Sequence, residues 1–244
     1  MTTAYSLDET LRRLAAKDAL LQVINLSGSL IGDEGAAALA QALASGTSPA
    51  LQVIDLRGNN IGDEGAEALA GALQRGSFPK LQDIDLDCNK IGNEGAKALA
   101  GSLERGSFLA LQDIWLSENN IGDEGAKALA AALERGSFPK LQCIELHWNR
   151  IGDVGAKVFA GALERGLFPA LEWICIDGNN IGDKMREQVQ RAISLMHCRV
   201  RVRAFLGAEL DRSPVTAAKR FILRDGDRAA MHRVLRFVMV AYAL

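Results

Sequence analysis

The sequence predicts an α/β solenoid, a stack of small strand-and-helix units, because the chain repeats one segment at a fixed period. The copies start every 30 residues, at Leu21, Leu51, Leu81, Leu111, Leu141 and Leu171. Within a copy the apolar residues first alternate, as in a strand, and then fall at helical spacing. The helical part is lined by Ala, so the layers can lie close together. A unit this small buries its apolar face only by stacking on its neighbours.

Residues 1–20 precede the repeats and are predicted to form a capping helix, from Ser6 to about Lys17. Three leucines in this segment fall at helical spacing among charged residues. The first five residues lack the apolar core of a signal peptide. This helix is expected to cover the first strand, as the ends of a solenoid require.

Inside the unit that starts at Leu51, a strand comes first and a helix follows after a turn. Asp63 is predicted to be the N-cap of that helix, with Glu64 in its first turn. Gly76 is predicted to end the helix in the left-handed conformation, and Pro79 to stop any continuation. The same signals return 60 residues later as Asp123, Gly136 and Pro139.

The repeat resembles a known family. Its pattern is Leu51-x-x-Ile54-x-Leu56-x-x-Asn59-x-Ile61, followed by Gly-Asp-Glu-Gly-Ala-x-Ala-Leu-Ala-x-Ala-Leu. This resembles the ribonuclease-inhibitor-like class of leucine-rich repeat, which is also found in NOD-like receptors and in the Ran GTPase-activating protein. Six repeats over residues 21–196 carry the resemblance. It implies a right-handed horseshoe arc with parallel strands on the concave face and helices on the convex face, usually used to bind another protein.

One asparagine per repeat follows the strand, and we predict that this row is structural. Its members are Asn59, Asn89, Asn119, Asn149 and Asn179. Where the chain leaves a strand, an amide side chain can satisfy backbone groups that the turn leaves unpaired. The first repeat has Ser29 at this position, which suggests a looser terminal unit.

The C-terminal part is a different kind of sequence. From Met1 to Asn180 the chain carries 15 Lys and Arg against 24 Asp and Glu, whereas from Ile181 to Leu244 it carries 13 against 6. Residues 197–244 are predicted to hold a degenerate seventh strand and then a basic cap or tail. The strand is expected from Cys198 to Leu206, where Val and Arg alternate.

Three interpretations stay open for the residues after Gly207: a pair of capping helices, a basic amphipathic segment, or a tail that does not belong to the ordered fold. Ser213 and Pro214 mark a helix start, so the segment suits a pair of capping helices. Its interspersed Arg residues also suit a basic amphipathic segment, with weak contact to a membrane surface or a partner. No stretch reaches the roughly 20 apolar residues that span a bilayer.

The repeats differ from one another at the strand positions expected to face the open concave side. These positions hold all three tryptophans, one histidine and eight acidic residues against a single Arg. The predicted partner-binding residues are Trp115, Trp148, Trp173, Asp55, Asp83, Asp85, Asp87, Asp113, Glu118, Glu145, His147 and Asp177. Exposed aromatic clusters are typical of binding surfaces, and an acidic row favours a basic partner. Sequence-specific nucleic-acid binding is disfavoured on this face.

Catalytic and metal chemistry find little support in the sequence. Cys143 and His147 lie on one strand, about 13 Å apart, too far to share a metal ion. Cys175 should lie beside Glu145 on the next strand, which leaves an incomplete ligand set for zinc. No phosphate-binding loop is present. No catalytic residue, metal, cofactor or small-molecule substrate is therefore predicted.

The sequence predicts a non-catalytic protein-interaction scaffold whose partner has a basic surface. Two alternatives stay open through the family resemblance. One is a GTPase-activating protein of the Ran type, although that family usually has an acidic tail and this C-terminus is basic. The other is a sensing or regulatory fragment of a NOD-like receptor system. The four cysteines show no disulfide spacing, so the cytoplasm is the predicted location and the nucleus the alternative.

Overall fold

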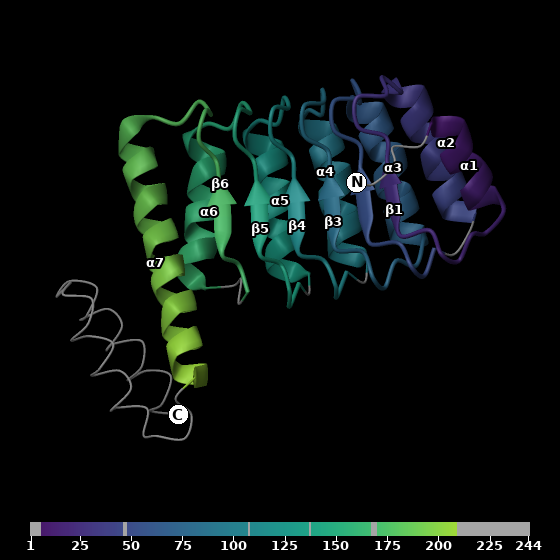
Figure 1. The fold of residues 1–244 in the computed structure, drawn as a ribbon. Helices are drawn as coiled ribbons and strands as arrows, with labels where there is room; N and C mark the ends of the chain where they lie inside the picture. Colours follow the sequence, from purple (N-terminus) through teal and green to yellow (C-terminus); the bar gives the residue numbers. More distant parts are fainter. Residues whose placement is uncertain (1–5, 46–47, 107, 137, 167–169, 209–244) are drawn as a thin grey trace.

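The computed structural model describes residues 6–45, 48–106, 108–136, 138–166 and 170–208. In this part of the chain six strands alternate with seven helices (Figure 1). The strands are β1 (Val23–Asn25), β2 (Val53–Asp55), β3 (Asp83–Asp85), β4 (Asp113–Trp115), β5 (Cys143–Glu145) and β6 (Trp173–Cys175). The helices are α1 (Leu7–Ala15), α2 (Gly32–Ser45), α3 (Asp63–Arg75), α4 (Asn93–Arg105), α5 (Asp123–Arg135), α6 (Asp153–Arg165) and α7 (Asp183–Ala208).

The six strands form one parallel sheet in chain order, β1 to β6, and every pair is in register at the 30-residue period. Figure 1 shows the sheet in front of the row of helices. Strands pack about 4.8 Å apart, whereas a helix with its side chains is about 10 Å wide. The helix layer is therefore the longer one, and the stack curves with the strands on the inside. The predicted α/β arc is confirmed.

The core lies between the two layers. Each repeat contributes buried residues from its strand and the position after it, such as Ile84 and Leu86, and helices α2 to α6 contribute buried Ala and Leu. Small residues allow the repeats to approach closely. A Cβ atom added to Gly95 would stand 2.8 Å from the Asp63 carboxylate and 2.9 Å from the Cβ of Ala66, both in the previous repeat. The Gly and Ala of the repeat therefore serve stacking.

The helix ends differ from the prediction. Gly62, not Asp63, is the N-cap residue of α3, and it makes no side-chain cap. Asp63 caps the next repeat instead, because its Oδ1 accepts the N–H groups of Gly92 (2.7 Å) and Gly95 (2.8 Å). Gly76 is extended, with φ −77° and ψ 167°, so it does not end α3 in the left-handed conformation. An added Cβ there would instead collide with the ring of Phe78, 2.3 Å away.

The later copies of these signals follow the same pattern. Asp123 caps α6 of the next repeat through Gly152 and Gly155, each at 2.8 Å. Gly136 is also extended, with φ −75°. The α6 helix departs from its neighbours, since Gly166 ends it in the left-handed conformation with φ 71°.

The predicted seventh strand from Cys198 to Leu206 is wrong, because that segment belongs to α7. No Gly or Pro interrupts the chain between Asp183 and Leu206. A helix that has already formed gains one hydrogen bond for each residue it adds, so it continues through the alternating Val and Arg residues. The predicted cap or tail after Gly207 falls on residues 209–244, outside the described part of the chain. No described helix is long and apolar enough to cross a membrane.

Candidate protein-binding face

The asparagine row holds the ends of the strands in place. The side-chain NH2 of Asn119 donates to the carbonyl oxygens of Leu86 (2.9 Å), Leu116 (3.2 Å) and Ser117 (3.1 Å). Its Oδ1 accepts the N–H of Ile91 at 2.9 Å. The side chain thus joins two repeats, and Asn59, Asn89, Asn149 and Asn179 make equivalent bonds. This row supports the concave face without being exposed on it.

Asp83 and Asp113 occupy the same position on the neighbouring strands β3 and β4 and are register partners. Both are half-buried. Burial raises the pKa of Asp83 to about 6, with further contributions from charge repulsion by Asp113 and a hydrogen bond to it. Burial also raises the pKa of Asp113. The paired carboxyl groups are therefore crowded and poorly hydrated.

The next position on the strands also carries carboxylates, but these have backbone partners. Asp55 Oδ1 accepts the N–H of Arg57 at 3.2 Å, and Asp85 Oδ1 accepts the N–H of Asp87 at 2.9 Å. Burial raises the pKa of Asp85 to about 6, although that hydrogen bond opposes the shift. These two aspartates satisfy turn N–H groups as well as adding negative charge.

Asp87 was predicted to be exposed on the concave face. That prediction is wrong, because only 8% of the surface of Asp87 is accessible. Its Oδ1 accepts the N–H of Ser117 at 2.6 Å, which draws the carboxylate down onto the next strand end. Burial raises the pKa of Asp87, against that hydrogen bond and the charges of His147 and Arg57. Asp87 therefore ties two repeats together rather than facing the open side.

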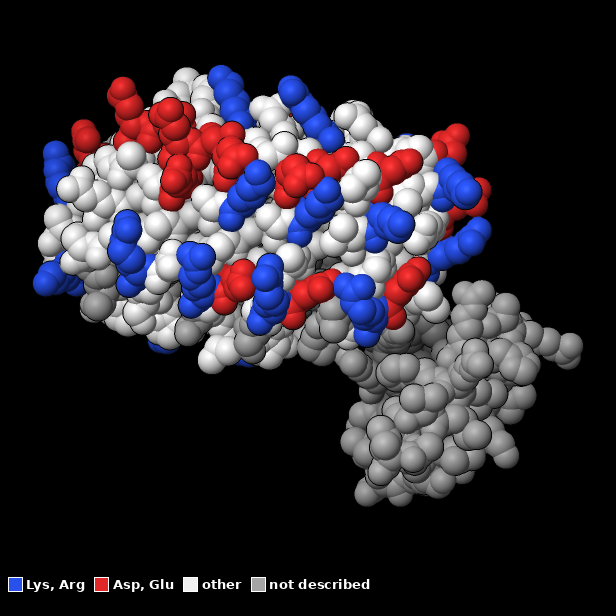
Figure 2. Space-filling model, turned by 180° about the vertical axis from the view of Figure 1, so that it is seen from behind, with Lys and Arg blue, Asp and Glu red and all other residues white. Residues whose placement is uncertain are grey.

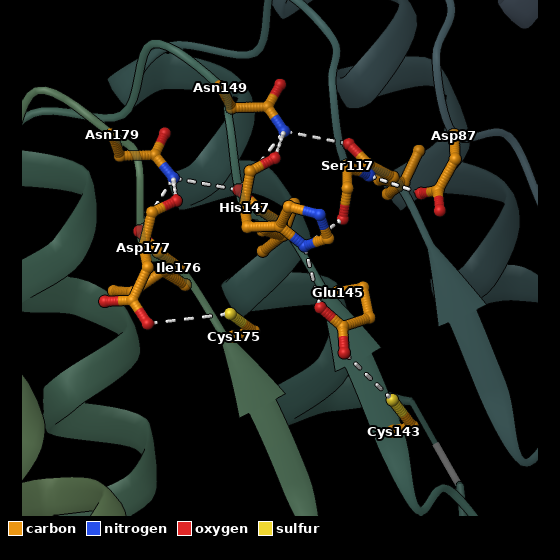
Figure 3. A network of polar contacts seen from close by, with 12 residues as sticks. Asp87, Ser117, Cys143, Glu145, His147, Asn149, Cys175, Ile176, Asp177 and Asn179 are labelled. Carbon is orange, nitrogen blue, oxygen red and sulfur yellow. Dashed lines mark hydrogen bonds and ion pairs between the residues drawn. The ribbon is translucent and has the colours of Figure 1, made fainter.

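Glu145, also predicted to be exposed, is likewise only 8% accessible. Its Oε2 lies 2.9 Å from Nδ1 of His147, and the same ring nitrogen lies 2.8 Å from Oγ of Ser117 (Figure 3). Cys143 and Cys175 lie beside it, each with a hydrogen-bond contact of 3.8 Å, from Cys143 to Glu145 and from Cys175 to Asp177. Histidine covers the carboxylate, which explains the burial that the sequence did not predict.

Burial disfavours the ionised form of the two thiols of this cluster. Burial raises the pKa of Cys143 to about 12, and the nearby charges of Glu145 and Asp113 add to the shift. Burial also raises the pKa of Cys175, although an N–H hydrogen bond from Asp177 opposes it. A thiol with a raised pKa is a poor nucleophile. Neither thiol therefore has the lowered pKa that is typical of a reactive cysteine.

The three tryptophans are differently placed. Trp148 and Trp173 are 66% and 54% exposed, whereas Trp115 is half-buried between its register partners Asp85 and Glu145. Each tryptophan stands at a different position of the repeat, so the three do not lie in one row across the sheet. The Trp148 ring covers Gly178 of the next repeat, where an added Cβ would stand 2.8 Å from it. Trp148 and Trp173 present exposed aromatic surface at the β5–β6 end of the sheet.

In three repeats the residue at the turn after the strand has a left-handed backbone conformation, and two of these residues belong to the predicted partner-binding set. Cys88, Glu118 and Trp148 have φ of 55°, 54° and 54°. The equivalent residues of other repeats are glycines, Gly58 and Gly178 among them, with φ of 69° and 70°. This conformation disfavours side chains with a Cβ. The middle repeats thus carry side chains where glycine fits the backbone better.

The convex face has a different charge pattern. Figure 2 shows rows of Lys and Arg running beside rows of Asp and Glu over the helices. Arg135 contacts Glu104 of the previous helix at 3.4 Å, and Arg165 contacts Glu134 in the same way. Lys127 contacts Glu124 within its own helix at 2.7 Å. Opposite charges alternate on this face and several form ion pairs, whereas carboxylates on the concave face are crowded together.

Comparison with known families identifies the class of protein. A model described as Leucine Rich repeat matches residues 18–40, 47–70, 79–100, 111–130 and 139–160. These segments coincide with successive repeats of the arc. The chain is a leucine-rich repeat protein of the ribonuclease-inhibitor-like class.

Two solved structures are similar to it in fold. One, described as "Leiomodin-1 Actin-Binding Site 2 (ABS2)", has a TM-score of 0.49 at 16% identity and covers 86% of this chain and 100% of its own. The other is the tropomodulin C-terminal domain from Caenorhabditis elegans, with a TM-score of 0.52 at 15% identity, covering 82% of this chain and 98% of its own. Identity this low carries no information on the partner. No curated protein sequence matches the chain.

Proposed function

We propose that this protein is a non-catalytic interaction module whose concave face binds a partner protein with a basic surface. The pairing of Asp83 with Asp113 carries this proposal. In the described part of the chain neither carboxylate has a Lys or Arg partner. Two half-buried carboxyl groups in register repel each other when both are ionised. A cationic side chain placed between them would relieve that repulsion.

The surroundings of the pair suit such a partner. Asp55 and Asp85 extend the negative charge along the sheet, and Glu118 and Asp177 are exposed at the strand ends. Long-range attraction to this charge speeds association with a basic surface. Trp148 and Trp173 would anchor the partner by burying aromatic area, as hot-spot residues do.

The proposed location is the cytoplasm, with the nucleus as the alternative. Cys88, Cys143 and Cys175 are free thiols in the described structure. Persistent free thiols are typical of a reducing compartment.

A pull-down from cell lysate tests the proposed face. The test variant is Asp83→Asn with Asp113→Asn, which keeps the shape of both side chains and removes two charges. The control is Glu64→Gln with Glu67→Gln, which removes the same charge from the exposed side of α3. We expect the wild type and the control to retain the same basic proteins, and the double Asn variant to lose them. If the folded double Asn variant retains them, the pair is not the binding site.

Binding of each captured protein is then measured with purified components at rising salt. Association driven by the acidic face should slow as salt screens the charges, over a Debye length of about 10 Å at 0.1 M.

A separate assay addresses the enzymatic alternative. The purified chain is added to a panel of GTPases and nucleotide hydrolysis is recorded. Reproducible stimulation of any member would contradict a non-catalytic module.

A further inference from the structure

The strand ends of β5 and β6 bring three different donor groups together. A carboxylate oxygen of Glu145, a ring nitrogen of His147 and Sγ of Cys175 all lie within 4.8 Å of one another. Glu145 and His147 come from one repeat and Cys175 from the next, in register with Glu145. Figure 3 shows the imidazole and the carboxylate side by side, with the thiol on the adjacent strand. We propose that these three side chains form a binding site for a Zn²⁺ ion.

The donor set fits zinc by type. Zn²⁺ binds thiolate, imidazole and carboxylate ligands, whereas Mg²⁺ and Ca²⁺ take oxygen ligands. Three protein ligands with a fourth position for water or another group are typical of zinc sites that stay open. Ligand atoms around a tetrahedral zinc ion stand about 3.5 Å apart, given Zn–N of about 2.0 Å and Zn–S of about 2.3 Å. To reach this spacing the 2.9 Å contact between Glu145 and His147 has to open slightly and the Cys175 thiol has to move closer.

The surroundings of the three side chains also suit a bound metal ion. Glu145 is buried and lies 2.9 Å from His147, so two of the three donors are already held close together. Oγ of Ser117 lies 2.8 Å from the imidazole Nδ1 and helps orient the ring. Cys175 also lines a pocket of about 170 Å³ at the outer edge of β6, beside Trp173 and Asp177. Of the three donors only Cys175 lines that pocket.

The repeat provides an internal comparison. At the strand positions of Glu145 and His147, the preceding repeat has Trp115 and Ser117, and the one before has Asp85 and Asp87. No other group of three such donors lies this close together in the described residues. The contact of His147 with Glu145 accounts for the burial of the carboxylate without involving the Cys175 thiol, which contacts Asp177. A metal ion involves all three groups.

Zinc binding by the purified full chain tests this site without any partner protein. The chain is first treated with chelator and reductant, and Zn²⁺ is then titrated in competition with a chromophoric chelator. We expect one ion per chain. Cys175→Ser and His147→Ala should each weaken binding about 100-fold or more, because even residues that only orient ligands are worth 10–100-fold. Cys88→Ser, which removes a thiol two repeats away, should bind as the wild type does.

Substitution of Co²⁺ gives a second readout. A thiolate-to-cobalt absorption band should appear with the wild type and the Cys88→Ser variant and be absent from Cys175→Ser. Circular dichroism checks that each variant is folded. Failure of the wild type to bind Zn²⁺ with a defined stoichiometry would overturn the site. So would unchanged binding by folded Cys175→Ser and His147→Ala. Neither result bears on the acidic pair, whose test uses no metal.

Discussion

Asp83 and Asp113 are register partners on neighbouring parallel strands, and burial together with the Asp113 carboxyl group raises the pKa of Asp83. Parallel strands in register place equivalent residues of successive repeats next to each other, so a residue type that recurs forms a row. A row of carboxylates is unfavourable unless protons or cations reduce its charge. The protein therefore keeps a destabilising arrangement on the concave face, where side chains are not needed for stacking of the repeats.

The first prediction concerns stability and pH. The pKa of Asp83 is about 6, above its ordinary value of 3.8. This group thus favours folding below pH 3.8, and the contribution is lost as pH rises through about 6. Asp83→Asn should stabilise the protein at pH 7.5 by about 1 kcal/mol, allowing for solvent screening at a half-exposed site.

Urea unfolding at two pH values checks this. The difference in unfolding free energy between Asp83→Asn and the wild type should shrink at pH 4.5, where the carboxyl group is already protonated. Glu64→Gln on α3 is the matched control. An equal gain at both pH values would show that the effect is not electrostatic.

The second prediction concerns the asparagine row. Asn119→Leu removes bonds to groups on two repeats and leaves buried backbone groups unpaired. The expected loss is about 1–3 kcal/mol of unfolding free energy for each unsatisfied group. Glu67→Ala, on the exposed side of α3, should change stability by less than about 0.5 kcal/mol. Equal melting temperatures for the two variants would argue against a structural role for the row.

The third prediction concerns capping between repeats. Asp123→Ala leaves the N–H groups of Gly152 and Gly155 without their acceptor. Loss of a cap of this kind typically costs about 0.5–2 kcal/mol. Asp123→Asn should be nearly neutral, since Asn93 plays the same part for Gly122 and Gly125. Thermal unfolding of both variants checks the comparison, and similar losses for Ala and Asn would contradict it.

The fourth prediction concerns the left-handed turn at Glu118, where φ is 54°. Valine tolerates this conformation poorly, so Glu118→Val should destabilise the protein by about 1–2 kcal/mol. Glu118→Gly should be at least as stable as the wild type, because glycine adopts the conformation without strain. Chemical denaturation ranks the three proteins. A valine variant as stable as the glycine variant would show that the turn rearranges.

The fifth prediction concerns the exposed tryptophans. Trp148→Ala combined with Trp173→Ala should weaken binding of the captured partner by about 2 kcal/mol or more. Stability should change little, because both side chains are mostly exposed. The control is Leu109→Ala, which truncates an apolar side chain that is 57% exposed outside the concave face. Calorimetry with the purified partner measures the difference, and equal affinities for the two variants would exclude the tryptophans as anchors.

The sequence alone determined the architecture. A 30-residue period, with alternation followed by helical spacing, leaves stacking as the only way for each unit to bury its apolar face. The same periodicity indicated where Asn119 and its equivalents would be needed, since every repeat leaves its strand in the same way. These features are local and recur many times, so one chain provides several copies of each signal.

Contacts between repeats were decided only by the tertiary structure. Asp63 caps the next helix rather than its own, and Asp87 turns down onto the next strand, because stacking brings residues about 30 positions apart within 3 Å. The residues that make one repeat unlike the others are also the ones that periodicity cannot place. Glu145, His147 and Cys175 form a cluster because neighbouring strands align in register. The course of α7 was settled by helix propagation, which the alternation of Val and Arg did not outweigh.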